Sequence, residues 1–140
     1  MPLFADIAAM QERFKERDLV QLTDEAGTGA IDSSMVERAL TSADALITGY
    51  IAARYQDTAT FAGQAILTDV ACDYAFSLLW QSDAPDWVMA KRKAAIDALK
   101  DIASGKIKLD AGIDTAAPRA DQIIVSGPER RFSRDSMGGF

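Results

Sequence analysis

Apolar residues recur at helical spacing through residues 1–105, and this repeat does not continue beyond them. The clearest example lies on one face of a helix and comprises Val36, Leu40, Ala43, Ile47 and Ile51. Residues 106–140 lack such a period and contain repeated Gly and Pro. A segment of that composition buries too little apolar surface to offset the entropy of ordering it. The pattern predicts an all-α domain over 1–105 and an extended C-terminal arm over 106–140.

The apolar pattern divides the body into a small bundle of about four helices. We expect the first from Leu3 to Glu16, followed by a turn that carries Leu19, Val20 and Leu22. The second carries the face described above, the third covers roughly 64–81, and the fourth runs from Pro85 to Ser104. Residues 23–30 and 56–63 are expected to be connections, and Gly105 to be the C′ residue of the last helix.

Two residues compete to cap the second helix. Ser34 and Glu37 fit a capping box, in which the hydroxyl and the carboxylate satisfy N–H groups of the first turn. Asp32 is the alternative N-cap. Within the arm, Gln122 to Val125 is a short β-prone run, so the arm is expected to hold short β segments.

Composition indicates a globular protein without membrane spans. The chain has 140 residues, 49% hydrophobic residues and one cysteine, Cys72, so it holds no internal disulfide and fits a reducing compartment. We expect neither a secretory leader nor a bilayer-spanning helix. Residues 1–105 carry nine Lys and Arg against sixteen Asp and Glu, whereas 106–140 carry six against five. An acidic body disfavours wrapping nucleic acid, because phosphate contacts depend on Lys and Arg.

The residues that most enzymes need are missing or isolated. The chain contains no histidine, so Ser-His-Asp and Cys-His arrangements cannot form within one subunit. Asp69 and Asp73 stand four residues apart beside Cys72 and could form an acid–base pair if buried. A solvated or interface stripe, with Cys72 as a small core residue, explains the same positions more simply. We expect no enzyme activity and no cofactor.

The loop from Asp24 to Met35 partly resembles a calcium-binding loop. Counting from Asp24, Thr28 falls at position five, Gly29 at six and Asp32 at nine. Ala26 stands at position three and Met35 at twelve, where strong oxygen ligands are required. We therefore favour a tight turn with an Asp cap and expect no metal site.

Two groups of residues are candidates for protein contacts. Arg and aromatic residues, which often anchor interfaces, cluster in the arm at Arg130, Arg131, Phe132, Arg134 and Phe140. The wide apolar surface of the third helix supplies further candidates, namely Tyr74, Phe76 and Trp80. The alternatives are a solvated chain end, or arginines that meet phosphates and bases of a nucleic acid.

Several stretches together resemble the small neck, or head-completion, proteins of Mu-like phages and prophages. The likeness lies in 19–32, 39–55, Ala71-Cys-Asp73, Gly105 to Leu109 and Arg131 to Met137. Their order and spacing carry the resemblance more than any single stretch. The chain departs from the family at 56–64, where relatives are proline-rich and this chain has no proline.

The resemblance implies a structural virion protein that joins the capsid portal to the tail. It implies a ring of about twelve copies around the portal axis, with the arms reaching a neighbouring subunit or the portal. The implied partners are further copies, the portal protein and a tail-side connector, while DNA passes through the channel without specific binding. The expected locations are the virion neck and, during assembly, the host cytoplasm. The alternative is a non-viral helical adaptor or regulatory module that binds a protein partner through its third helix.

Overall fold

The structure is a computed structural model that describes residues 2–109 of the chain. Its helices are α1 (Ile7–Arg13), α2 (Glu16–Thr23), α3 (Ser33–Ala52), η1 (Ala59–Phe61, a 3-10 turn), α4 (Ala65–Leu79) and α5 (Asp86–Ser104). The all-α prediction is confirmed for residues 2–109, within which no strand occurs. Five α-helices form in this range instead of about four. The expected β segments of the arm lie outside the described residues.

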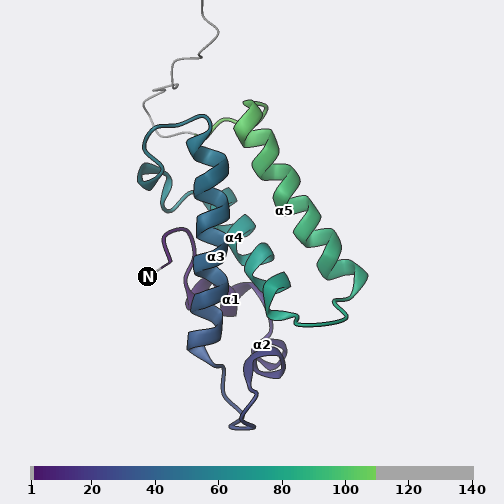
Figure 1. The fold of residues 1–140 in the computed structure, drawn as a ribbon. Helices are drawn as coiled ribbons and strands as arrows, with labels where there is room; N and C mark the ends of the chain where they lie inside the picture. The colour runs from purple at the N-terminus through teal and green to yellow at the C-terminus, as the bar shows by residue number, and fades with distance from the viewer. Residues whose placement is uncertain (1, 110–140) are drawn as a thin grey trace, which may run out of the picture.

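Helix α4 is the central element of the bundle (Figure 1). It packs along both α3 and α5 and also contacts α1. Its buried side chains are spread around the helix and include Leu67, Val70, Ala71, Cys72, Ala75, Phe76 and Leu79. A central helix must be apolar on several sides, so the wide apolar surface read from the sequence is explained mainly by neighbours within the subunit.

Helix α3 forms where the sequence predicts it, but Asp32 is its cap. The Asp32 carboxylate accepts hydrogen bonds from the backbone N–H groups of Ser34 at 2.9 Å and Met35 at 3.4 Å. The Ser34 hydroxyl donates to the same carboxylate at 2.6 Å, so the capping-box assignment of Ser34 and Glu37 is wrong. The side chains of the predicted apolar face are fully buried. Asp32 begins the helix and this face fixes its rotation toward the core.

Helix α1 is shorter than the first predicted helix, and α2 occupies the stretch that was predicted to be a turn. Phe14 and Lys15 adopt extended backbone angles, with φ −119° and ψ 149° at Phe14. The extended backbone lets the Phe14 ring stack on Phe76 of α4, with ring centroids 4.0 Å apart. Neither Gly nor Pro marks the break, so the gain from this tertiary contact overrides helix propensity. The expected single helix from Leu3 to Glu16, with a turn after it, was therefore wrong.

The beginning of the predicted arm packs on the bundle. Helix α5 ends at Gly105, whose φ of +85° is left-handed, as expected of a C′ glycine. The chain then turns back, because the N–H of Ile107 donates to the carbonyl oxygen of Asp101 at 3.2 Å. Leu109 is only 4% exposed, and its N–H donates to the Tyr55 hydroxyl at 3.3 Å. The core thus includes a residue from the segment assigned to the arm.

The connection that departs from the phage resemblance has a definite path in this chain. It contains η1 and buries Phe61, whose ring lies 4.7 Å from the ring of Tyr55. The aromatic pair attaches the connection to the end of α3 beside Leu109.

Candidate protein-interaction surface

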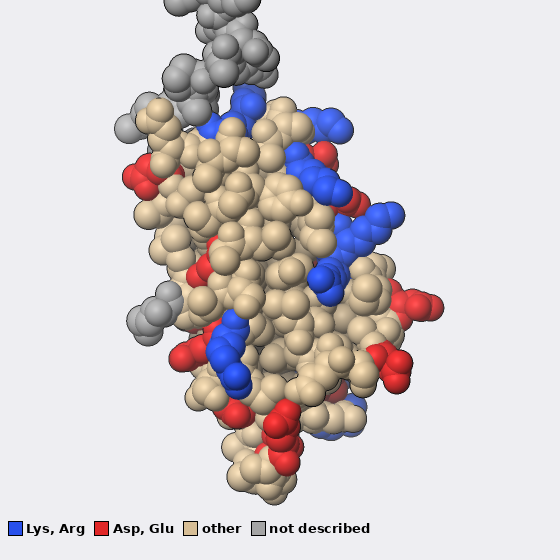
Figure 2. Space-filling model, in the orientation of Figure 1, with Lys and Arg blue, Asp and Glu red and all other residues tan. Residues whose placement is uncertain are grey.

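Many of the carboxylates and several surface hollows lie at one end of the molecule. We call it the acidic end and define it as residues 18–38 and 80–87, which comprise most of α2, the loop to α3, the start of α3 and the α4–α5 connection. It carries seven Asp and Glu side chains and one arginine, Arg38. In Figure 2 Asp and Glu surround the lower part of the molecule, where Figure 1 places α2 and these loops.

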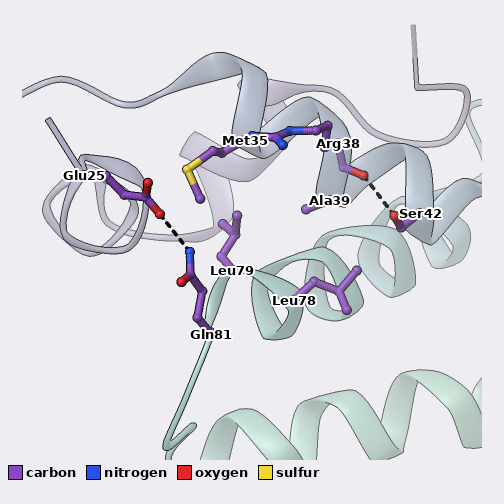
Figure 3. A pocket seen from close by; sticks show the side chains of 8 residues that line it. All are labelled: Glu25, Met35, Arg38, Ala39, Ser42, Leu78, Leu79 and Gln81. Carbon is purple, nitrogen blue, oxygen red and sulfur yellow. Dashed lines mark hydrogen bonds between the residues drawn. The ribbon is translucent and has the colours of Figure 1, made fainter.

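One hollow at this end, the main groove, lies between the start of α3 and the end of α4 (Figure 3). Its volume is about 450 Å³, and its lining comprises Glu25, Met35, Arg38, Ala39, Ser42, Leu78, Leu79 and Gln81. The apolar members form its floor. On one rim the Gln81 amide donates to the Glu25 carboxylate at 2.9 Å. The groove thus combines an apolar floor with a polar, charged rim, as protein-binding surfaces do.

A second hollow, the tryptophan pocket, adjoins the main groove. It measures about 180 Å³ and is lined by Asp18, Gln21, Leu22, Phe76, Trp80, Pro85 and Trp87. A third hollow of about 270 Å³ connects the two, because it shares Glu25, Leu79 and Gln81 with the groove and Leu22 and Trp80 with the pocket. The three hollows form one continuous surface across the acidic end.

Two tryptophans give the pocket its chemistry. The Trp80 Nε1–H is buried and finds no acceptor among residues 2–109, which is costly for a donor removed from water. Trp87 is 50% exposed and lies beside Phe76, with ring centroids 5.8 Å apart. Two residues further along α5, Met89 is 48% exposed. Exposed Trp and Met side chains are enriched at protein interfaces.

The tight turn expected after Asp24 forms as predicted. The Asp24 carboxylate accepts hydrogen bonds from the N–H groups of Thr28 at 2.8 Å and Gly29 at 2.7 Å. These bonds stabilise the charged form and lower the pKa of Asp24. Gly27 and Gly29 have φ values of +73° and +74°, which the turn requires. Both Asp24 oxygens are used by the turn, and within residues 2–109 no three potential metal ligands converge.

The Asp69 and Asp73 pair is held by cations. Arg13 donates from Nε and Nη2 to the two oxygens of Asp73, each at 2.9 Å, and from Nη1 to Asp69 at 2.8 Å. The hydrogen bond to Asp73 raises the pKa of Arg13. Lys91 of α5 lies 3.6 Å from Asp73, so this network joins α1, α4 and α5. The pair acts as a structural ion-pair site between helices.

Cys72 lies in the core, as predicted. Its side chain is 1% exposed, and burial raises the pKa of the thiol to about 11. A thiol with a raised pKa holds little thiolate at neutral pH, which makes it a poor nucleophile.

The predicted interface residues divide into three groups. Tyr74 and Trp80 are partly exposed, and Trp80 follows the last residue of α4 instead of lying inside the helix. Phe76 is 1% exposed and stacks on Phe14, so it belongs to the subunit core and reaches the surface only at the tryptophan pocket. The arm residues Arg130, Arg131, Phe132, Arg134 and Phe140 lie outside the described residues.

Sequence reasoning missed the exposed Trp87. It lies in the predicted fourth helix and was not among the candidate contact residues. Its neighbour Val88 is the buried residue of this turn, with 0% exposure. The signal that could have revealed it is the helical period: Val88, Ala95, Leu99 and Ile102 share one face of α5, and Trp87 lies about 100° away from Val88, at the edge of that face.

Comparison with known proteins identifies the family but adds no characterised relative. None of the helices in the described part of the chain has the length and apolar content to cross a bilayer. A search of curated proteins found no match to the chain. The family model described as Bacteriophage Mu, Gp36 matches residues 4–126, which include all five helices. The chain therefore belongs to the bacteriophage Mu Gp36 family.

Proposed function

We propose that this protein is a structural component of the phage neck, where a ring of subunits joins the capsid portal to the tail. Membership of the Mu Gp36 family carries this proposal, because it ties the chain to a phage. The protein would act in the virion, and in the host cytoplasm while particles assemble. The non-viral adaptor has no comparable support.

The charge and surface of the body suit this role. The acidic end offers connected hollows with apolar floors and charged rims, which fit protein partners. Weak contacts repeated around a closed ring add up through effective concentration, so each single interface can be modest. A channel lined by an acidic body lets DNA pass without being held.

We propose no catalytic function. Asp69 and Asp73 are engaged by Arg13 and Lys91, and the Cys72 thiol is buried with a raised pKa. These groups are the ones that sequence analysis singled out for chemistry. Their interactions stabilise the subunit instead of presenting a reactive group.

The experiment is deletion of the gene from the phage or prophage, followed by electron microscopy of the particles. We expect filled heads and free tails that fail to join, with joining restored by the full chain supplied in trans. Deletion of residues 128–140 is expected to impair joining as well. Normal infectious particles without the protein would contradict the neck role.

The ring is tested separately by measuring the molar mass of the complex, which gives the number of copies in it. Purified protein mixed with the portal protein of the same phage should form a complex that contains many copies, measured by light scattering after size exclusion. A complex with a single copy would support an adaptor instead of a ring.

A further inference from the structure

Charge is separated between the two ends of the molecule. The acidic end is defined above. The opposite end, residues 51–60 and 100–108, carries Arg54, Lys100, Lys106 and Lys108 against Asp57 and Asp101. Figure 2 shows Lys and Arg gathered over the upper part of the molecule and over α5. The chain leaves the described body at this opposite end, because Leu109 is bonded to Tyr55.

The remaining chain is long enough to reach a neighbouring acidic end. Helix α3 has 20 residues and spans about 30 Å at 1.5 Å per residue. The 21 residues from Leu109 to Arg130 cover up to about 70 Å when extended. The intervening chain is therefore long enough to carry the segment from Glu129 to Asp135 beyond a distance equal to the length of α3. This segment lies beyond residues 4–126, which the family model matches.

The chemistry of this segment complements the acidic end. It places Arg130, Arg131 and Arg134 around Phe132. The connected hollows offer apolar walls from Leu78, Leu79, Trp80 and Trp87, and carboxylates from Glu25 and Asp18. An aromatic anchor in an apolar groove with arginines on an acidic rim is a favourable pairing at interfaces.

We propose that residues 129–135 of one subunit dock on the acidic end of a second copy. Phe132 enters the connected hollows, and the arginines pair with carboxylates on their rim. The contact joins two different parts of the chain, so it is heterologous and can repeat from copy to copy. The proposal rests on the ring assembly proposed above and names the surface through which adjacent copies bind.

Disulfide trapping between two full-length variants tests the contact. One variant carries Ser133→Cys in the arm, and the other carries Ser82→Cys, an exposed residue that lines the connecting hollow. Ser104→Cys is the matched control, since Ser104 is also exposed but lies at the opposite end. Native Cys72 is buried and stays in all three chains. We expect the 82–133 disulfide between chains to exceed the 104–133 disulfide by about tenfold or more, measured by mass spectrometry.

Charge reversal tests the mechanism. Arg130→Glu, Arg131→Glu and Arg134→Glu together should lower the 82–133 yield about tenfold. Glu25→Arg with Asp18→Arg on the acceptor chain should lower it similarly, and combining both sets should restore most of it. Higher salt should weaken the unmodified pair, because its charges are partly exposed.

Each outcome decides the proposal. Equal 82–133 and 104–133 yields would overturn it. A chain carrying both Ser82→Cys and Ser133→Cys that closes only on itself, with no disulfide between mixed single variants, would overturn the second-copy assignment. If heads and tails join through this protein while the 82–133 disulfide is absent, the neck role stands and this contact fails. If the disulfide forms but particles join without the protein, the contact stands and the neck role fails.

Discussion

At the scale of single residues, Arg13 links two helices through three side-chain hydrogen bonds. Its guanidinium binds both oxygens of Asp73 and one oxygen of Asp69, and so ties α1 to α4. Asp73 is 16% exposed and Asp69 is 60% exposed, so most of the stabilisation comes from the Asp73 pair.

We expect Arg13→Met to lower the free energy of unfolding by about 1–3 kcal/mol, because a largely buried carboxylate loses its bidentate partner. Methionine keeps much of the aliphatic stem. Urea unfolding followed by circular dichroism measures the change. The control is Arg17→Met, since Arg17 is 85% exposed and lies 3.8 Å from Asp18, and its loss should cost less than about 0.5 kcal/mol. Equal effects would show that the Arg13 network is not stabilising.

Cys72 gives the protein an alkaline sensitivity with a definite sign. Its pKa rises from an ordinary 9.0 to about 11 on folding, because burial disfavours the thiolate. A group whose folded pKa is raised contributes stability below the unfolded pKa and loses it as pH rises through the folded pKa. Stability should therefore fall between pH 9 and 11, by at most about 1.4 kcal/mol per pH unit from this group.

The measurement compares unfolding of the native chain and Cys72→Ala across that pH range. The difference between their free energies of unfolding at each pH isolates the contribution of the thiol, because all other ionisable groups are the same in both chains. A difference that does not change with pH would refute the prediction.

At the scale of helices, replacing glycine by alanine is expected to change stability in opposite directions at two positions, Gly49 and Gly105. Gly49 lies inside α3, and an added Cβ there would meet no atom within 4 Å. Gly105 has φ +85°, and an added Cβ would clash with the guanidinium group of Arg54. Arg54 can move aside, but the left-handed backbone still disfavours any other residue.

Gly49→Ala should stabilise the protein by about 0.5–1 kcal/mol, because alanine favours the helix and restricts the unfolded chain. Gly105→Ala should destabilise it by about 1 kcal/mol or more. Chemical denaturation of both variants gives the two signs directly. If both changes shift stability the same way, the end of α5 is not held in the left-handed conformation.

The helices also show what a single sequence can reveal. The period of α3 and the glycine after α5 are local signals, so the sequence predicted both. The break between α1 and α2 is not local, because it depends on the stacking of Phe14 on a residue 62 positions later. No turn residue marks it, and the apolar pattern predicted a helix that continues to Glu16, with a turn where α2 lies.

At the scale of the whole molecule, the core is completed by a residue that follows the last helix. Leu109 is 4% exposed and lies at the junction of α3, the connection with η1 and the end of α5. Its position was not predictable, because Lys106, Ile107, Lys108 and Leu109 alternate like a strand and have no helical period. The candidate surface was not predictable either, because it is assembled from separate parts of the chain, namely α2, two loops and the ends of α3 and α4.

Leu109→Ala in the full chain should lower the free energy of unfolding by about 2 kcal/mol, since it leaves a cavity in the core. Lys108→Ala is the matched control, because Lys108 is exposed and its change should be near zero. Thermal and urea unfolding test the pair. Similar stability of the two variants would mean that the core does not depend on this segment.

The chain has only two tryptophans, and both stand at the acidic end. Indole emission depends strongly on local polarity, so the intrinsic fluorescence of this protein reports on that one surface without any added label. A partner that covers Trp87 should shift the emission to shorter wavelength, whereas one that binds the opposite end should leave the spectrum unchanged. The molecule therefore carries its own optical probe for distinguishing its two poles.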